Sequence, residues 1–224
     1  MTDARSPGPV DPPKDCNACP RLVGLRQDLQ VQFPDWFNAP VPTFRSADAP
    51  QLLIVGLAPG MRGANRTGRP FTGDYAGDLL YETMIDFGFA QGTYRADPED
   101  GLALRGAMIT NAVRCLPPEN KPTGPEIRTC RPYLLSTLRA DPALKLVLAL
   151  GRIAHDTFLS ALDQRRAAHP FAHGARHELT GTGLVLYDSY HCSRYNTNTG
   201  KLTTEMFRSV FSAMRQELDA AGSA

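Results

Sequence analysis

The sequence has few lysines, almost no net charge and no long hydrophobic run. No segment reaches the roughly 18 consecutive apolar residues of a membrane-spanning helix, so we expect no membrane partner. Lysine and arginine total 24 against 23 aspartate and glutamate residues, which gives a net charge of +1. A strongly basic domain is therefore excluded, and any nucleic-acid contact must come from a local patch. No G-x4-G-K-[ST] run is present, which excludes a P-loop NTPase.

The start of the chain, MTDARSPGPVDPPKD, also lacks the apolar segment of a secretory signal. Its proline-rich, polar composition predicts a flexible tail over residues 1–14. A single domain is predicted to follow over residues 15–220, with no internal repeat. We expect a cytoplasmic protein, in which the five cysteines would not form structural disulfides.

Short apolar runs alternate with segments of helical period along the chain. This alternation predicts βαβ units and a single α/β domain, with a central parallel four-stranded sheet flanked by helices. The strands are expected at residues 51–56, 107–113, 145–150 and 183–187. The helices are expected at residues 75–89, 125–138, 152–166 and 203–220, and the loop at 168–182 has room for an extra strand.

The loop after the first predicted strand is rich in glycine and arginine. It reads GLAPGMRGANRTGRPFTGD, from Gly56 to Asp74. Glycine lets backbone amides approach a ligand closely, arginine recognises phosphate, and an aromatic ring such as Phe71 can stack on a base. The loop therefore suggests a nucleotide or nucleobase pocket with a carboxylate at its edge, although an ordinary strand-to-helix loop is an alternative.

Two further polar loops follow the second and fourth predicted strands. They read NAVRCLPPENKPT and SYHCSRYNTNTGKLT. Ligands of open α/β sheets bind outside the carboxyl ends of the strands, where such loops meet. We therefore expect the three loops to share one cleft.

Four of the five cysteines have a spacing that is compatible with metal binding. Cys16 and Cys19 form a C-x2-C pair, Cys115 ends the second strand and Cys130 lies in a predicted helix. A tetrathiolate site for zinc or for an iron–sulfur cluster fits this pattern, and the spacing does not choose between them. Free buried thiols are the third interpretation. Cys192 is assigned to the cleft instead.

Taken in order, GLAPG, NRTGRPFTGD, the four cysteines and a His-x-Ser loop before the last helix resemble the iron–sulfur uracil-DNA glycosylases. The match is closest to family 5, or type b, and spans the chain from Cys16 to the last helix. The resemblance implies a 4Fe–4S cluster on Cys16, Cys19, Cys115 and Cys130. It also implies removal of uracil and other damaged bases from DNA, by a small repair enzyme that is most simply a monomer.

The resemblance assigns the base pocket to the first and second loops. Phe71 would stack on a flipped base, and the backbone from Gly56 to Gly60 would bind its edge. Alternatively, Phe71 is a loop residue whose side chain packs into the hydrophobic core. The predicted base-binding residues are Gly56, Leu57, Ala58, Pro59, Gly60, Phe71, Asn111 and Ser193.

Three side chains are candidates for the chemistry. Asp74 would stabilise positive charge on the sugar or activate water, although its place before a helix equally suits an N-cap. His191 would donate a hydrogen bond to the departing base, and Asn120 would orient water or base. Each is assigned by its match to the motifs of family 5.

The resemblance also supplies candidate DNA contacts. Arg194 and Tyr195 stand at the tip of the third loop, which would enter the duplex. Arg66, Arg69, Lys121 and Lys201 are candidates for phosphate contacts, with solvated surface charge as the alternative for each.

One position departs from the family pattern. The family has His-Pro-Ser where this chain has His191-Cys192-Ser193, so the loop loses the fixed φ of proline. The main hypothesis is a uracil-DNA glycosylase that leaves an abasic site. A non-catalytic damaged-DNA-binding iron–sulfur protein and a zinc-stabilised nucleotide-binding module are the alternatives.

Overall fold

The computed structural model describes residues 10–222. A six-stranded sheet of order β1-β5-β2-β6-β8-β7 forms its centre. The four inner strands are parallel, and β1 and β7 add antiparallel edges. The strands of this sheet are β1 (Phe44–Arg45), β2 (Leu52–Gly56), β5 (Ala107–Asn111), β6 (Leu146–Leu150), β7 (Arg176–Leu179) and β8 (Leu184–Ser189). The predicted parallel four-stranded core is confirmed.

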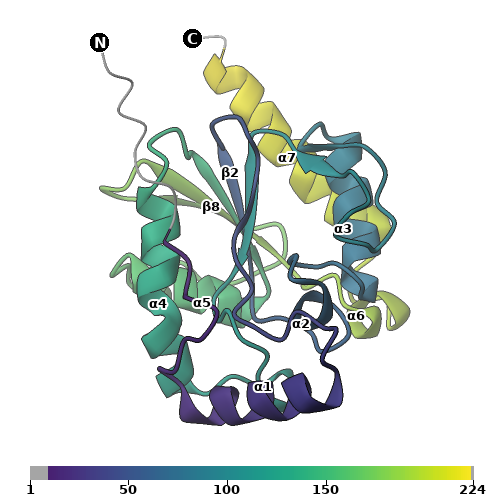
Figure 1. Ribbon diagram of the computed structural model, residues 1–224. Helices are drawn as coiled ribbons and strands as arrows, with labels where there is room; N and C mark the ends of the chain where they lie inside the picture. The colour runs from purple at the N-terminus through teal and green to yellow at the C-terminus, as the bar shows by residue number, and fades with distance from the viewer. Residues whose placement is uncertain (1–9, 223–224) are drawn as a thin grey trace, which may run out of the picture.

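Helices cover both faces of the sheet (Figure 1). On one face α3 and α7 enclose a core that includes Leu80, Met84 and Phe211. On the other face α4 and α5 enclose a second core around Leu134 and Phe158. The covering helices are α3 (Tyr75–Asp86), α4 (Gly124–Arg139), α5 (Arg152–Ala161) and α7 (Thr204–Gly222).

The inner strands β2, β5 and β6 are buried at every position. A parallel sheet with helices on both faces has no polar side, so its strands read as continuous apolar runs. The α4 helix begins with a capping box, in which Thr123 and Glu126 exchange side-chain and backbone hydrogen bonds. These local signals explain why the main elements could be placed from the sequence.

Several short elements were not predicted. The α1 helix lies across the lower edge of the molecule in Figure 1, beside α2 and below α4. The predicted helix at 152–166 ends earlier and is followed by a separate turn of 3-10 helix. The unpredicted elements are α1 (Pro20–Gln32), β1 (Phe44–Arg45), α2 (Ala64–Thr67), β3 (Ala90–Gln91), β4 (Ala103–Leu104), η1 (Pro118–Asn120), η2 (Arg166–Ala168) and α6 (Arg194–Asn198).

The predicted tail over residues 1–14 lies partly outside the described residues. Within the rest, the Asp11 carboxylate accepts hydrogen bonds from the Arg114 guanidinium at 2.7 Å and from the Thr43 hydroxyl at 3.0 Å. Arg114 is 1% exposed. Ordered packing therefore begins before residue 15, because a buried cation needs this carboxylate.

None of the helices in residues 10–222 has the length and apolar character needed to cross a membrane.

Candidate active site

A cavity of about 300 Å³ opens at the carboxyl edge of the sheet, where the three polar loops meet. It brings together most of the residues expected to bind or cleave a ligand. The lining residues are Leu57, Ala58, Pro59, Gly60, Ala64, Phe71, Asp74, Ala76, Asn111, Asn120, His191 and Ser193.

Phe71 is a wall of this cavity in a constrained backbone conformation. Its φ is +53°, in the left-handed region that non-glycine residues rarely adopt. Its ring centroid lies 5.8 Å from that of His191. Gly56 lies behind the ring, since a Cβ there would stand 2.7 Å from Phe71 Cζ and closer still to Asn111 Oδ1. Gly56 thus makes room for two pocket side chains.

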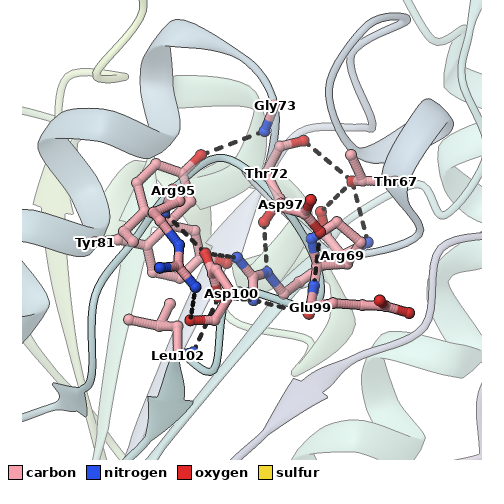
Figure 2. A network of polar contacts seen from close by, with 12 residues as sticks. Thr67, Arg69, Thr72, Gly73, Tyr81, Arg95, Asp97, Glu99, Asp100 and Leu102 are labelled. Atoms are coloured by element: carbon pink, nitrogen blue, oxygen red, sulfur yellow. Dashed lines mark hydrogen bonds and ion pairs between the residues drawn. The ribbon is translucent and has the colours of Figure 1, made fainter.

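A buried polar network holds the Phe71 loop in place (Figure 2). The Tyr94 hydroxyl donates to the Phe71 carbonyl at 3.1 Å and accepts from the Gly73 amide at 3.3 Å. The Tyr81 hydroxyl donates to the Pro70 carbonyl at 2.6 Å. Two tyrosines from outside the loop therefore fix the backbone on both sides of the strained residue.

Arg69 belongs to the same network, so its assignment as a phosphate contact is wrong. Its guanidinium donates two hydrogen bonds to Asp100, at 2.9 and 2.8 Å, and a third from Nε to Thr72 at 2.7 Å. Arg69 is buried, and its guanidinium carbon lies 5.5 Å from the centre of the Tyr81 ring. The guanidinium beside Asp100 lowers the pKa of that carboxyl far below its usual range.

Asp74 stands at the N-cap position of α3 without making the expected capping hydrogen bond from its side chain. Within the described residues its Oδ1 atom is buried and has no hydrogen-bond partner. Burial raises the pKa of Asp74, against the opposing pull of the Ala76 and Gly77 amides. A positive charge or a water molecule that donates a hydrogen bond in the cavity would stabilise the ionised form of this carboxylate.

His191 faces the cavity from the third loop. Burial lowers the pKa of His191 to about 4, so the imidazole is neutral near pH 7. The Asn196 amide donates to the His191 carbonyl at 2.8 Å, and the Ser193 hydroxyl accepts from the Asn196 backbone N–H at 3.4 Å. The start of α6 therefore orients this loop, with Ser193 as its N-cap.

Cys192 is fully buried beneath the cavity and does not line it. Its thiol donates to the Ala76 carbonyl, with an Sγ–O distance of 3.4 Å. This contact ties the His191 loop to the first turn of α3, next to Asp74. The loop that lacks proline is thus held by a tertiary contact.

The two asparagines lie at different depths. Asn111 is buried at the end of β5, and Asn120 is exposed on the rim. Glu119 and Asn120 both have positive φ, at 53° and 56°. This uncommon turn brings Asn120 to the cavity wall.

Cys16, Cys19, Cys115 and Cys130 line a second, smaller hollow at the same edge of the sheet. Burial and then the neighbouring Cys130 thiol raise the pKa of Cys115 to about 12. Grouped thiolates repel one another unless a cation binds them, so this donor set suits a thiophilic metal centre.

A buried cation lies beside the four cysteines. Arg26 and Cys115 line one hollow, and the Arg26 Nη1 has no hydrogen-bond partner among the described residues, whereas its Nη2 donates to the Cys16 carbonyl at 2.9 Å. A guanidinium with this unsatisfied donor suits a negatively charged metal centre.

Ala58 contacts both regions. It lines the cavity of Asp74 and packs against the apolar cluster that contains Cys130. One small side chain thus touches both the cavity wall and the surroundings of the four cysteines.

A third group of side chains that could bind a metal, His155, His177 and Asp188, already forms hydrogen bonds within itself. His155 and His177 each contact a different oxygen of the buried Asp188, at 2.7 and 3.1 Å. The second ring nitrogen of His155 lies 2.8 Å from the His169 carbonyl. Since these groups are already paired with one another, we interpret them as a polar network that joins α5 to β7 and β8.

The remaining candidate DNA contacts lie on the surface. Arg66 is exposed and bonded to the Arg62 carbonyl, and Lys121 forms an exposed ion pair with Glu119. Tyr195 is 74% exposed. The Arg194 guanidinium lies 5.2 Å from the Tyr75 ring centre, and the Lys201 ammonium 5.0 Å from that of Tyr190.

The fold and the cavity define an α/β protein that offers one small ligand an aromatic face and an unpaired carboxylate. Residues 43–215 match the family model of the uracil DNA glycosylase superfamily. The chain belongs to that superfamily.

Named relatives agree with this placement. A type-5 uracil-DNA glycosylase of Thermus thermophilus is 44% identical, over 87% of this chain and 90% of the relative. One from Pyrobaculum aerophilum is 37% identical, over 88% of this chain and 86% of the relative. A type-4 uracil-DNA glycosylase of Sulfurisphaera tokodaii is 28% identical over 71% of this chain and 68% of the relative. The type-5 relatives are thus more similar than this type-4 protein.

Proposed function

We propose that this protein is a type-5 uracil-DNA glycosylase, which hydrolyses the N-glycosidic bond of uracil in DNA and leaves an abasic site. The observation that carries the proposal is the buried Oδ1 of Asp74, which has no hydrogen-bond partner among the described residues, in a cavity shared with Phe71 and His191. The similarity to type-5 relatives over most of the chain supports the choice of substrate.

The cavity would hold the base after it leaves the duplex. Phe71 offers its face for stacking, and the backbone from Leu57 to Gly60 lines the edge. The Asn111 amide, fixed at the end of β5, can both donate to and accept from the uracil edge. Excluding water from this space strengthens each of these polar contacts.

Asp74 would act on the sugar side of the bond. Cleavage of the bond between C1′ and the base nitrogen moves its electron pair to the base and positive charge to the sugar. The carboxylate stabilises that charge, accepts a proton from the attacking water, and so lets the water oxygen bond to C1′. Asn120, on the rim, would help orient this water.

His191 would stabilise the leaving uracil anion. A neutral imidazole donates a hydrogen bond without carrying a full charge, and burial keeps His191 neutral. Ser193 lines the same wall. The donated bond becomes stronger as negative charge gathers on the base oxygen, which is the condition for lowering the barrier.

Arg66, Lys121, Arg194 and Lys201 would contact DNA phosphates around the cavity, and the exposed Tyr195 would enter the duplex. Lys121 is already paired with Glu119, at 3.1 Å, and would exchange that partner for phosphate. Lys121 and Lys201 are the lysines of the cavity loops, and neither lines the cavity. We therefore propose hydrolysis without a lyase step.

We propose that Cys16, Cys19, Cys115 and Cys130 hold a 4Fe–4S cluster. When bound, the cluster would cross-link the segments that carry these cysteines. It would transfer no electron, because hydrolysis needs none. Cys16 and Cys19 directly precede α1, Cys115 lies in the loop after β5, and Cys130 lies in the middle of α4. We further propose a cytoplasmic monomer that also accepts other deaminated bases, such as hypoxanthine.

A direct test scores abasic sites in a uracil-containing oligonucleotide treated with wild type and with Asp74→Asn. The variant keeps the side-chain size and removes the charge, so the single-turnover rate should fall about 100- to 1,000-fold. Asp78→Asn is a matched control, because Asp78 lies one turn further along α3 and is exposed. No product from wild type would refute the proposed function, and an unchanged rate in Asp74→Asn would refute the role of Asp74.

A further inference from the structure

The His191 ring reaches the base pocket without a hydrogen bond of its own. Within residues 10–222 the ring forms no hydrogen bond, and its aromatic contact is with Phe71, at 5.8 Å between centroids. The Asn196 amide donates to the His191 carbonyl at 2.8 Å. The direction of the imidazole is therefore set by the backbone on its two sides, and Asn196 holds the C-terminal side.

His173 holds the backbone on the N-terminal side. Its Nδ1 accepts from the backbone N–H of Tyr190 at 3.2 Å, one residue before His191. Its Nε2 lies 3.2 Å from the carbonyl oxygen of Met206, in the first turn of α7. The rings of His173 and Tyr190 also stack, with centroids 5.1 Å apart and planes inclined by 24°. One side chain thus links the start of α7 to the segment that carries His191.

These contacts fix the protonation state of His173. A backbone N–H only donates, so Nδ1 must be unprotonated, and a carbonyl only accepts, so Nε2 must carry the proton. The Ser189 hydroxyl also lies 3.4 Å from Nδ1, but it donates to the Tyr190 carbonyl at 2.9 Å. Burial lowers the pKa of His173, which favours the neutral ring. His173 therefore bonds as one neutral tautomer.

The turn that carries His173 is itself bonded to β8. Gly174 has a φ of +78°, in the region that favours glycine. Its N–H donates to the Asp188 carbonyl at 2.9 Å. Asp188 lies two residues before Tyr190. The two partners in the His173–Tyr190 hydrogen bond therefore come from segments that are already bonded to each other.

We propose that His173 is a positioning residue for base excision, which acts through the Tyr190 N–H to place the His191 ring against the base. The inference rests on the proposed function and deepens it, because it gives a role to the loop at 169–175, which no sequence motif marked. His173 does not line the cavity, so its effect on the reaction passes through the peptide backbone. A reacting group displaced by about 1 Å can cost about 100-fold in rate.

Asparagine and glutamine separate the two contacts of His173. In His173→Asn the Oδ1 atom takes the place of Nδ1 and can accept from the Tyr190 N–H. In His173→Gln the Nε2 atom takes the place of the ring Nε2 and can donate to the Met206 carbonyl. Each variant therefore keeps one contact and loses the other.

The main measurement is the single-turnover rate of uracil release by the metal-loaded protein. His173→Asn should stay within about twofold of wild type, whereas His173→Gln should fall by about 10- to 100-fold. Both should lower the melting temperature by about 2–4 °C, since each loses one hydrogen bond. Affinity for a duplex with a stable abasic-site analogue should be unchanged in both, because His173 acts on the cleavage step.

His177→Gln is the matched control, because it makes the same substitution at a half-buried histidine of the neighbouring strand β7. It should keep the wild-type rate. Equal rates in His173→Asn and His173→Gln, or an equal loss in the control, would overturn the proposal. So would a fall in DNA affinity that matches the fall in rate.

A second measurement does not depend on turnover. NMR of the imidazole nitrogens should show His173 of the wild type with its proton on Nε2. The ring signals of His191 should shift in His173→Gln and keep their wild-type values in His173→Asn. A proton on Nδ1 of His173, or unchanged His191 signals in both variants, would overturn the proposal. Failure of the wild type to release uracil would instead refute the proposed function, and the NMR comparison would still decide the role of His173.

Discussion

Asp74 is half-buried and its Oδ1 atom is buried without a hydrogen-bond partner among the described residues, and both features follow from its place between a glycine-rich loop and a helix start. A Cβ on Gly63 would lie 2.8 Å from the Asp74 carboxyl carbon, and one on Gly60 would lie 3.0 Å from its Oδ2. The glycines let backbone approach the carboxylate where a side chain would otherwise stand. The Asp74 carboxylate is therefore poorly solvated in the protein without substrate. Positive charge that develops on the sugar during cleavage would stabilise this carboxylate more than it is stabilised before the reaction.

The pH dependence of base excision should report these groups. Burial raises the pKa of Asp74 and lowers the pKa of His191 to about 4. The proposed active form has Asp74 ionised and His191 neutral, so the single-turnover rate should fall as the pH drops through the raised pKa of Asp74 and through the pKa of His191. Rate measurements on a uracil duplex check this.

In Asp74→Asn the remaining fall should follow His191 alone, with its midpoint near pH 4. An acid limb that is identical in the two proteins would contradict the assignment of Asp74.

Gly56→Ala should impair the site through packing. The new methyl group would meet the Phe71 ring and the Asn111 amide, which must move by about an ångström, and such a displacement can cost about 100-fold in rate. Steady-state kinetics with uracil-containing DNA measure the loss.

The control is Gly24→Ala in α1, where a Cβ meets nothing within 4 Å. It should keep full activity and gain about 0.5–1 kcal/mol in the free energy of unfolding. Full activity in Gly56→Ala would show that the pocket is not tightly packed there.

Residue types alone did not distinguish residues that bind a ligand from residues that stabilise the fold around the site. Arg66 and Arg69 stand three apart in one loop and read alike as phosphate contacts. Asp100, the partner that buries Arg69, is 31 residues further on. Nothing in the local pattern predicts that pairing. The motif positions Phe71, Asp74 and His191 could be placed together, because each follows a strand at the same edge of the sheet.

At the scale of elements, the loop that carries Phe71 depends on the segment from β3 to β4. Both Tyr94 and Asp100 come from this segment. Tyr94 donates to the Phe71 carbonyl of the loop, and Asp100 accepts from the Arg69 guanidinium. Gly77 of α3 allows the approach, since a Cβ there would clash with the Phe71 carbonyl and the Tyr94 hydroxyl. The strained φ of Phe71 is thus maintained by contacts from outside the loop.

Tyr94→Phe tests this dependence, because it removes only the hydroxyl. It breaks two hydrogen bonds and should lower the free energy of unfolding by about 1–3 kcal/mol. The rate of uracil release should also fall, by about tenfold, because Phe71 and Asp74 lose their fixed backbone. Thermal unfolding and single-turnover kinetics measure the two effects.

Tyr187→Phe is the control for Tyr94→Phe. Tyr187 donates to Glu217 at 2.5 Å, away from the cavity. Its loss should lower stability without lowering the rate. If both variants lost activity equally, the effect of Tyr94 would be a general loss of stability.

The sequence predicted the long elements well because each has a local physical signal. Continuous apolar runs mark the buried strands, and a six-residue apolar stripe marks α7. The α1 helix lacks such a signal, since one of its three buried positions is Arg26 beside Leu22 and Leu29. Short edge strands such as β1 and β3 arise from tertiary pairing, which no local pattern encodes.

At the scale of the whole molecule, the four cysteines come from distant parts of the chain, and the proposed cluster would cross-link these parts. Cys115→Ser should lose iron and lower the melting temperature by roughly 10 °C, since losing several kcal/mol of metal binding costs about 2–4 °C per kcal/mol in a domain of this size. Iron analysis, visible absorbance and thermal unfolding check this. Cys192→Ser, at the cysteine outside the proposed set, should retain its iron. Full iron content in Cys115→Ser would refute the ligand assignment.

A cluster on the proposed cysteines would make base excision depend on iron supply. Ala58 lines the cavity and packs against the apolar cluster that contains Cys130, so loss of the proposed metal would disturb a neighbour of the cavity wall. Uracil excision would then fall under iron starvation even though Asp74 and His191 are unchanged.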